Sequence, residues 1–478
     1  MNYPDTQLYI HGEWVDANDG AYLDVINPAD ETKIGKVAKA NIQDLDCAID
    51  SAEQGFAVWK NMPAQKRSKL MRKAAQLLRD RADQIAYIMT LEQGKPLVQA
   101  KGEVLAGADT IEWFAGEALR AYGRLVPPRA LDVQSMVVKS PVGIVAAFTP
   151  WNFPINQVVR KLSAALAAGC AIIIKAPEET PASPAQLIQA FHDAGIPAGV
   201  INLVYGIPAE ISEYLILHPS IKKISFTGST PVGKQLASLA GQHMKKATME
   251  LGGHAPVLIF KDADLDVAAK EMIAAKFRNA GQVCIAPTRF IIQREVYAEF
   301  VEKLNKLMSA LHVGNGLDEK SDIGPMIHQR GFENIQHLIA DAIQQGAVLC
   351  SGGKALSGKG YFMQPTLLKD VPLTAKCMNS EPFAPLILCI PFDEYEDAVQ
   401  EANRLNFGLA AYAYSASNRT CMALARDIQA GMLTINYNGL SVPELPFGGM
   451  NDSGYGSEGG SEAIEAYLNT RLVTVAGR

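Results

Sequence analysis

The side chain best suited to covalent chemistry in this sequence is that of Cys284, in the stretch "FRNAGQVCIAP" (277–287). A thiolate attacks electrophilic carbon readily, and nucleophilic cysteines commonly have a lowered thiol pKa. Free cysteines more often pack as small hydrophobic residues. Because Cys284 follows the glycine-containing segment "NAGQV" and not an apolar run, we favour the chemical role. We expect the other cysteines to be structural.

A second candidate is Glu250, which stands between Met249 and "LGG" in an apolar context. A carboxylate in such surroundings is either a capped structural acid or a general base. Partial desolvation would raise the pKa of a general base toward neutrality. The sequence around Glu250 leaves both interpretations open.

The segments that must position these residues alternate between strand and helix. Apolar strands are expected within 143–150, 170–177, 200–206 and 221–229, with helices within 157–169, 183–195 and 209–219. A second series of the same kind begins with "PVLIF" at 256 and runs to about 430. Alternation at this pitch predicts βαβ units and a parallel sheet, so the fold class is α/β.

Ligands bind at the carboxyl ends of such strands, and polar residues follow several of them. Asn152 follows the first strand, and Lys175 and Glu178 follow the second, where they could hold the ribose hydroxyls of a nucleotide. After 221–225 comes "FTGSTPVGK", which matches neither common phosphate-loop pattern. Its Ser229 or Thr230 predicts a helix N-cap, and the same helix N-terminus could hold a pyrophosphate.

The overall composition narrows the class of protein. A length of 478 residues predicts two or three domains, and a net charge of −6 gives no footprint for nucleic acid. Seven cysteines without a C-x-x-C pair indicate a reducing, cytoplasmic compartment. We find no signal-peptide pattern, no apolar stretch long enough to span a membrane and no metal-ligand spacing, so no metal is expected.

Seven blocks of the chain resemble the aldehyde dehydrogenase superfamily in their order and spacing. They are "FTPWNFP", "KAPEETP", "FTGSTPVGK", "MELGGHAP", "FRNAGQVC", "EPFAP" and "LPFGGMNDSGYG". The resemblance covers essentially the whole chain. Within the superfamily the sequence looks most like the succinate-semialdehyde and 2-oxoglutarate-semialdehyde dehydrogenases.

The resemblance implies an aldehyde dehydrogenase-like fold with a parallel-sheet nucleotide-binding domain, an α/β catalytic domain and a small β arm. The expected NAD-binding domain comprises 1–125 and 144–253, and the expected catalytic domain 254–430. The arm would comprise 126–143 and 458–478 and join subunits into a homodimer or homotetramer. Residues 431–457 would return to the NAD-binding domain and form a loop at the substrate mouth.

The resemblance also assigns catalytic roles. Cys284 would attack the aldehyde, while the Asn152 amide and the Cys284 backbone N–H would stabilise the resulting oxyanion. Glu250 would then activate the water that hydrolyses the thioester. Because a coenzyme A-acylating enzyme has no use for such a base, release of the free acid is expected.

The implied cofactor is NAD, with NADP possible. Glu178 would accept the adenosine 2′-hydroxyl and disfavour a 2′-phosphate. Glu381, in "EPFAP", matches the acid that holds the nicotinamide ribose, and Phe383 packs beside it. The full set of expected cofactor-binding residues is Thr149, Pro150, Trp151, Lys175, Glu178, Gly228, Ser229, Val232, Gly233, Leu251, Glu381 and Phe383.

The resemblance places Arg160 and Arg278 on elements that border the substrate tunnel, at positions that are arginine in semialdehyde dehydrogenases. It therefore implies a substrate with a distal carboxylate, which a guanidinium binds in bidentate fashion. Gln157 and Ser441 are further candidates for this contact. The expected reaction is oxidation of 2-oxoglutarate semialdehyde or succinate semialdehyde to the dicarboxylic acid. If the arginines pair with internal acids instead, the alternative is a broad-range enzyme for neutral aldehydes. A non-catalytic relative is the alternative of another class.

Overall fold

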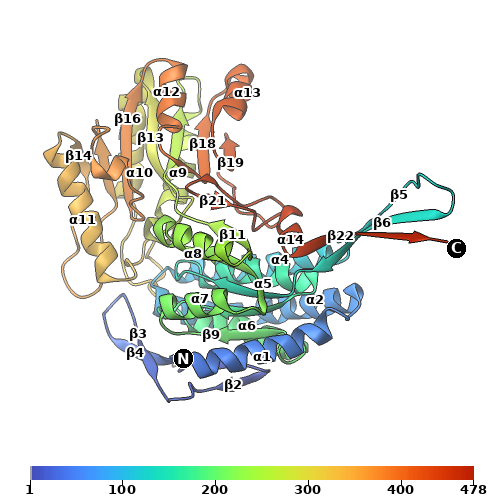
Figure 1. Ribbon diagram of the computed structural model, residues 1–478. Coiled ribbons are helices and arrows are strands. Elements are labelled where there is room, and N and C mark those ends of the chain that lie inside the picture. The colour runs from blue at the N-terminus through green and yellow to red at the C-terminus, as the bar shows by residue number, and fades with distance from the viewer. Residues whose placement is uncertain (1–2, 478) are drawn as a thin grey trace.

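The computed structural model describes residues 3–477 and contains two large sheets, one below the other in Figure 1. The lower sheet has eight strands in the order β2-β1-β9-β8-β7-β10-β11-β21. Their bounds are β1 Leu8–Ile10, β2 Glu13–Val15, β7 Ile144–Phe148, β8 Ala171–Lys175, β9 Ile201–Val204, β10 Ile221–Thr227, β11 Lys246–Glu250 and β21 Gly454–Tyr455. The five strands from β9 to β11 are parallel, which confirms the predicted α/β class.

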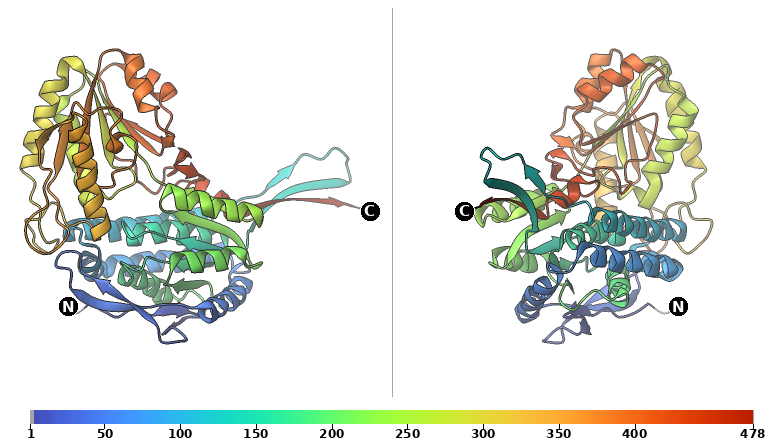
Figure 2. Two further views of the ribbon diagram at one scale, coloured as in Figure 1. Left: turned by 60° about the vertical axis from the view of Figure 1, so that its left-hand side comes forward. Right: turned by 90° about the vertical axis from the view of Figure 1, so that its right-hand side faces the viewer.

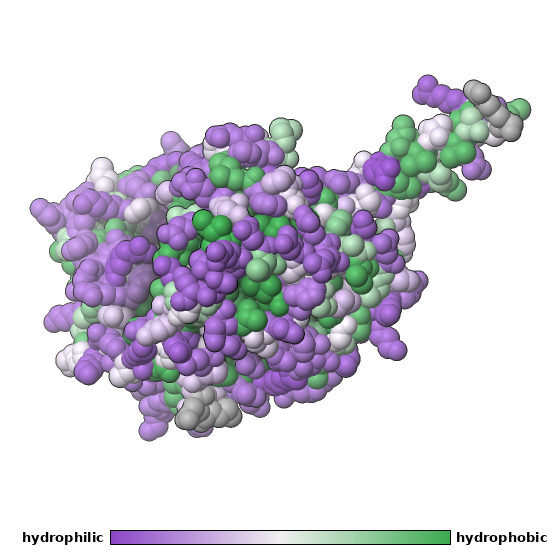
Figure 3. Space-filling model, turned by 60° about the horizontal axis from the view of Figure 1, so that its bottom comes forward, coloured by the Kyte–Doolittle hydropathy of each residue, from purple (hydrophilic) through white to green (hydrophobic). Residues whose placement is uncertain are grey.

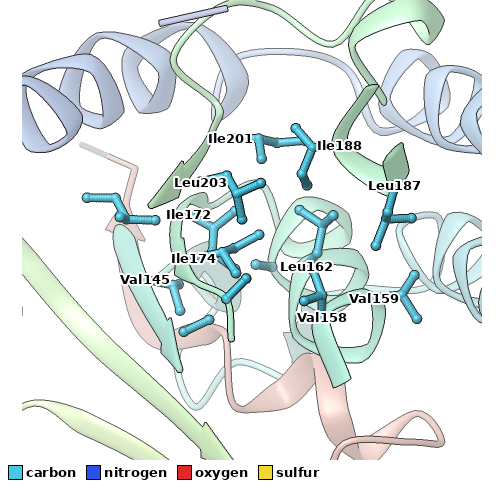
Figure 4. Close-up of a cluster of buried hydrophobic side chains, with 14 of the residues drawn as sticks. Val145, Val158, Val159, Leu162, Ile172, Ile174, Leu187, Ile188, Ile201 and Leu203 are labelled. Atoms are coloured by element: carbon cyan, nitrogen blue, oxygen red, sulfur yellow. The ribbon is translucent and has the colours of Figure 1, made fainter. Parts of the chain in front are cut away.

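Eight helices accompany this sheet: α1 Ile42–Trp59, α2 Ala64–Asp80, α3 Ala82–Gln93, α4 Leu97–Glu117, α5 Pro154–Ala168, α6 Ala182–Ala194, α7 Pro208–Leu217 and α8 Thr230–Gln242. Strands β7 and β8 are fully buried, as is nearly all of α5, because further helices cover its outer side. Figure 4 shows part of this core, where aliphatic side chains of the strands meet those of α5 and α6.

The upper sheet has seven strands in the order β14-β15-β16-β13-β12-β18-β19. Their bounds are β12 Ala255–Ile259, β13 Pro287–Gln293, β14 Val348–Ser351, β15 Thr366–Lys369, β16 Leu386–Phe392, β18 Ala410–Tyr414 and β19 Met432–Ile435. Its helices are α9 Leu265–Phe277, α10 Arg294–Ser309, α11 Gln329–Gln344, α12 Tyr395–Ala402 and α13 Asn418–Asp427. A separate hydrophobic core, from Ala255 to Phe447, belongs to this sheet.

A three-stranded arm extends away from the rest of the chain (Figure 2). It consists of β5 (Arg124–Val126), β6 (Val133–Pro141) and β22 (Leu468–Ala476), with β6 in the middle. Its register runs from Leu468 opposite Pro141 to Ala476 opposite Val133. The arm exposes several large hydrophobic side chains, and Figure 3 shows hydrophobic residues along its length. They are Leu125, Val126, Leu131, Leu472 and Val475.

The remaining elements are short: β3 Tyr22–Ile26, β4 Lys33–Ala38, β17 Phe407–Gly408, β20 Met450–Asn451, α14 Glu462–Glu465 and the 3-10 helices η1 Arg278–Gly281 and η2 Lys376–Met378. None of the helices within 3–477 has the length and apolar character needed to cross a membrane.

Three expected segment boundaries need correction. The first arm strand begins at Arg124 and not at 126. Strand β19, placed by the sequence in the returning segment 431–457, pairs with β18 and is the edge of the upper sheet. Glu458, placed in the arm, is buried against Lys161 of α5. Each boundary depends on the partner that the segment meets: β5 pairs with β6, β19 pairs with β18, and Glu458 meets Lys161, 297 residues earlier.

Candidate active site

One cleft runs across the carboxyl ends of β7, β8 and β10, where a parallel sheet commonly binds its ligand. It consists of two cavities of about 630 Å³ and about 420 Å³. Both cavities are lined by Pro150, Trp151, Thr227 and Gly228, so they adjoin. The smaller cavity also has walls from the second core, including Cys284. The cleft therefore reaches from the first sheet to the candidate nucleophile.

The cleft collects eleven of the twelve expected cofactor residues. The larger cavity is lined by Thr149, Pro150, Trp151, Lys175, Glu178, Gly228 and Val232. The smaller cavity adds Ser229, Leu251, Glu381 and Phe383. The twelfth residue, Gly233, is buried behind the cleft. A Cβ at position 233 would lie 2.2 Å from Leu251 Cδ2, so this glycine lets α8 pack against Leu251.

The N-terminus of α8 opens onto the cleft. Ser229 is its N-cap residue, as predicted, but its side chain makes no capping hydrogen bond. The Thr230 hydroxyl instead donates to the carbonyl of Asp452 at 3.0 Å. Since no side chain caps this first turn, its backbone N–H groups suit an anionic ligand such as a pyrophosphate.

Polar atoms without protein partners mark both ends of the cleft. Thr149 Oγ1 is buried and unpaired in the larger cavity, and Glu381 Oε1 is buried and unpaired in the smaller one. Lys175 and Glu178 form an ion pair with each other at the end of β8. Buried polar groups normally have a hydrogen-bond partner, so these residues fit a ligand with hydroxyl groups along its length, such as a dinucleotide.

Cys284 lies half-buried after a backbone segment of unusual conformation. Asn279 and Ala280 have φ angles of +50° and +53°, in the left-handed region that non-glycine residues rarely adopt. The Gln282 side chain holds this turn, because its amide donates to Asn279 O at 3.1 Å and its oxygen accepts from Ile327 N at 3.0 Å. Such strain persists only where surrounding contacts enforce it, which is typical of functional loops.

The thiol of Cys284 is not acidified in this structure, so the expectation of a lowered pKa is wrong here. Burial raises the pKa to about 12, and the carboxyl groups of Glu381 and Glu250 add to this increase. Arg160 and Arg278 act in the opposite direction. Formation of a thiolate therefore needs a base, or a ligand that changes the surroundings of the thiol.

Asn152 is buried beside the Cys284 loop. Its Nδ2 donates to the carbonyl of Gln282 at 3.1 Å, while its Oδ1 has no partner. A side-chain amide carries two N–H donors, so one hydrogen remains for an oxygen bound next to Cys284. This placement brings together two residues that the sequence separates by more than a hundred positions.

Glu250 is the last residue of β11 and is 2% exposed. Neither of its carboxyl oxygens has a hydrogen-bond partner. Burial raises its pKa well above the ordinary value, and Glu458 raises it further, while Lys161 and Arg160 lower it. A base of this kind takes up a proton more readily than an exposed carboxylate does.

The expected substrate residues are only partly brought together. Gln157 lines the smaller cavity. Arg160 is 7% exposed and donates to Ser441 Oγ at 2.8 Å and to the carbonyl of Glu458 at 3.1 Å. Arg278 is exposed, with its guanidinium carbon 5.0 Å from the ring centroid of Phe153. Both arginines lower the pKa of Cys284, so both act electrostatically on the thiol.

Residues 14–473 match the aldehyde dehydrogenase family. The chain belongs to this family. It is 43% identical to the 4-(hydroxymethyl)benzenesulfonate dehydrogenase TsaD1 of Comamonas testosteroni, over 98% of each chain. It is 42% identical to the NADP(+) succinate-semialdehyde dehydrogenase GabD of Escherichia coli K12, over 98% of this chain and 97% of that one. A crystal structure of succinate-semialdehyde dehydrogenase from Burkholderia pseudomallei has a TM-score of 0.97 at 39% identity, covering 99% and 98% of the two chains.

As an aldehyde dehydrogenase, the protein is an oxidoreductase that acts on aldehydes and uses NAD or NADP. One solved relative, the aldehyde dehydrogenase of Bacillus cereus, is an NAD+ complex, with a TM-score of 0.97 at 32% identity. The predicted family and fold are thereby confirmed.

Several buried charged residues of this aldehyde dehydrogenase escaped the sequence analysis. Lys161 forms an ion pair with Glu458, whose carboxylate also accepts from Ser225 Oγ at 2.9 Å. Lys276 is fully buried, and its Nζ has no partner. Burial lowers the pKa of Lys276 to about 7, while Glu381 raises it. The only available signal was position, since Lys161 adjoins Arg160 and Lys276 lies close to Cys284.

Proposed function

We propose that this enzyme oxidises a semialdehyde with a distal carboxylate, 2-oxoglutarate semialdehyde or succinate semialdehyde, to the dicarboxylic acid. The observation that carries the proposal is the pair of arginines. Arg160 and Arg278, from different segments of the chain, both lower the pKa of Cys284, and Arg278 lies against the ring of Phe153, next to Asn152. Two guanidinium groups around one nucleophile favour an anionic substrate over an alkyl aldehyde.

Cys284 is the proposed nucleophile. Once a base has taken the thiol proton, the sulfur adds to the aldehyde carbon and gives a thiohemiacetal whose oxygen carries negative charge. The free N–H of the Asn152 amide and the backbone N–H of Cys284 would stabilise this oxygen, each by about 3 kcal/mol in comparable sites. A bound nicotinamide supplies the hydride acceptor for the oxidation. Cys284 then carries the acyl group as a thioester.

Glu250 is the proposed base for hydrolysis of the thioester. Its two unpaired, buried oxygens are free to accept a proton from a water molecule. Water attacks the acyl carbon, Glu250 takes the proton, and the bond to Cys284 Sγ breaks. The carboxylic acid is released and the sulfur leaves as a thiolate, the form that adds to the next aldehyde. A base at this position supports hydrolysis over transfer to coenzyme A.

The proposed cofactor preference is NAD over NADP. Lys175 and Glu178 would hold the adenosine ribose, and Glu381 the nicotinamide ribose. The Glu178 carboxylate lines the larger cavity and disfavours a second negative charge there. Its ion pair with Lys175 reduces this repulsion without removing its hydrogen-bonding oxygens.

We also propose that the two hydrophobic cores correspond to the NAD-binding and catalytic domains. The exposed apolar residues of the arm support a homodimer or homotetramer, because such a surface is usually covered by another subunit. The cytoplasmic location remains a prediction.

The test is steady-state formation of the reduced cofactor with succinate semialdehyde, 2-oxoglutarate semialdehyde, a sulfonate-bearing aldehyde and a neutral aldehyde of similar length. The sulfonate is included because one relative is named for a benzenesulfonate substrate. We expect kcat/KM for the carboxylates to exceed that for the neutral aldehyde by about tenfold or more, which is about 1.4 kcal/mol.

Arg278→Gln should remove most of this preference. The control is Arg294→Gln, which makes the same charge change at an exposed arginine that pairs with Asp393. An unchanged preference in Arg278→Gln, or equal rates on the neutral aldehyde, would contradict the carboxylate assignment. If kcat/KM is higher for the sulfonate-bearing aldehyde than for the two carboxylates, the preferred anionic group is a sulfonate and not a carboxylate.

A further inference from the structure

A buried ion pair lies directly behind the candidate oxyanion residue. Lys95 Nζ and Glu103 Oε2 are 2.5 Å apart, and each side chain is 1% exposed. Lys95 follows the C-terminus of α3, where Gly94 has a φ of +91°. A Cβ at Gly94 would lie 2.6 Å from Pro325 Cγ, so a side chain there would push this loop away from the second core. The ion pair is thus held at the junction between the two cores.

The two members of the pair hold opposite ends of one short segment. Lys95 Nζ donates to the carbonyl of Asn152 at 2.8 Å. Glu103 Oε1 accepts from the backbone N–H of Ile155 at 2.9 Å and of Asn156 at 3.2 Å. These N–H groups belong to the first turn of α5, whose N-cap residue makes no side-chain hydrogen bond. Glu103 therefore supplies the cap that α5 lacks locally.

The same segment is tied to the loop of the nucleophile. Asn279 Nδ2 donates to the carbonyl of Asn152 at 2.9 Å, so this carbonyl accepts from Asn279 and Lys95 together. The Asn152 side chain in turn donates to Gln282 O at 3.1 Å. Backbone and side chain of Asn152 are therefore both fixed relative to residues 279–284.

Between these anchors, the Phe153 ring contacts two cations. Lys95 Nζ lies 4.0 Å from the ring centroid and the Arg278 guanidinium carbon lies 5.0 Å from it. Such contacts are favourable, particularly where water is excluded. A displacement of Lys95 would thus disturb both the oxyanion residue and a candidate substrate arginine.

From these contacts we propose that Lys95 and Glu103 are positioning residues that fix the Asn152 amide at the place where the oxyanion forms. This inference rests on the proposed function, in which Asn152 is an oxyanion donor. An oxyanion donor is effective only when it is held about 3 Å from the developing charge, and small misplacements reduce its effect strongly. Neither Lys95 nor Glu103 needs to touch the substrate.

The test is a double-mutant cycle of Lys95→Met with Asn152→Ala, with kcat/KM for the aldehyde as the readout. We expect Lys95→Met to lower kcat/KM by about tenfold or more in the wild-type background. In the Asn152→Ala background the same change should lower it by less than about twofold, because the donor that Lys95 positions is already absent. Glu103→Gln, which keeps the side-chain size, should show the same non-additivity if Lys95→Met does not fold.

Two controls separate positioning from general damage. Alkylation of Cys284 by iodoacetamide forms no oxyanion, so its rate should change little in Lys95→Met or Glu103→Gln. Glu92→Gln alters another buried acid, one that accepts from Ala182 N and Ser183 N at the start of α6, and should leave kcat/KM nearly unchanged.

If the reductions in kcat/KM caused by Lys95→Met and Asn152→Ala multiply in the double variant, the positioning role is overturned but the proposed function is not. A parallel loss of the alkylation rate would do the same, because it would indicate a displaced Cys284. An Asn152→Ala enzyme with unchanged kcat/KM would instead overturn the oxyanion role in the proposed function, and the positioning role with it.

Discussion

Buried acids in this protein fall into two groups, those inside the packed body and those at the cleft. Within the body, Glu92 accepts from Ser183 Oγ and two backbone N–H groups and also contacts Tyr3. Glu103 and Glu458 each pair with a buried lysine and accept further hydrogen bonds. At the cleft, Glu381 Oε1 has no hydrogen-bond partner. Both oxygens of Glu250 also lack a partner, and the residues that follow Glu250, Leu251 and Gly252, line the smaller cavity.

The difference shows what each group is for. Burial alone raises a carboxyl pKa, and even with its hydrogen bonds Glu92 has a pKa raised to about 7. Glu381, which lacks such a set of partners, has a pKa raised to about 8. The body acids stabilise helix starts and lysines. The cleft acids leave carboxyl oxygens without a partner in the chain, which lowers folding stability. These oxygens are available to accept hydrogen bonds from a ligand or from water.

Replacement of Glu250 by glutamine should give the largest effect. Without the base, kcat should fall by roughly 10²–10⁴-fold, while the first turnover persists as a burst of reduced cofactor. Although this replacement lowers kcat, it should increase folding stability. The pKa of Glu250 is higher in the folded than in the unfolded chain, so its ionisation destabilises the fold progressively as the pH rises above the unfolded value.

Thermal unfolding of wild type and Glu250→Gln between pH 5 and pH 8 measures this sign. The stability of Glu250→Gln relative to that of the wild type should increase as the pH increases. If Glu250→Gln is less stable than the wild type at pH 8, Glu250 stabilises the fold as the acids inside the packed body do.

Replacement of Glu458 by glutamine should lower folding stability. It would leave Lys161 as a buried cation without its carboxylate, and breaking a buried pair typically costs about 3–5 kcal/mol. Denaturant unfolding gives the free energy directly. The matched control is Glu462→Gln on α14, an exposed acid nearby, for which we expect a change below about 0.5 kcal/mol. Equal losses in the two variants would show that the Lys161 pair contributes no more than a surface charge.

The third and smallest expected effect concerns Glu381 and the cofactor. Its pKa of about 8 means that the fraction of ionised carboxylate rises as the pH increases through 8. The ionised form accepts hydrogen bonds from ribose hydroxyls better, so KM for NAD should fall several-fold between about pH 7 and pH 9. Glu381→Gln should have a higher KM that is nearly independent of pH. A wild-type KM that is flat over this range would argue that Glu381 does not bind the ribose.

The sequence predicted the cleft better than it predicted the contacts that support it. Asn152, Lys175 and Glu250 were found because the ends of parallel strands share one edge of the sheet, which follows from the βα alternation alone. The partners Lys95 and Glu103 carry no such signal, because each is one charged residue in a helical region. Their meeting with Asn152 depends on how α4 packs against both α3 and α5, and periodicity does not specify helix packing between distant segments.

The pKa of Cys284 shows a second limit. The glycine-containing loop indicated a reactive cysteine, but the state of the thiol depends on Glu250 and Glu381, which other parts of the chain bring close to it. A local motif indicates the proposed nucleophile. The electrostatic field that controls it comes from the completed fold.

Strand β21 has a consequence for biosynthesis. It pairs Gly454 with Glu250, and Lys161 meets Glu458 only across 297 residues of chain. At roughly 5–20 residues per second, a ribosome needs about 15–60 s to travel from Lys161 to Glu458. Lys161 lacks its acid throughout that interval, and the edge of β11 stays open from the synthesis of Glu250 to that of Gly454. The nascent chain therefore already contains Cys284, the proposed nucleophile, before the strand that pairs with Glu250, the proposed base, has been made.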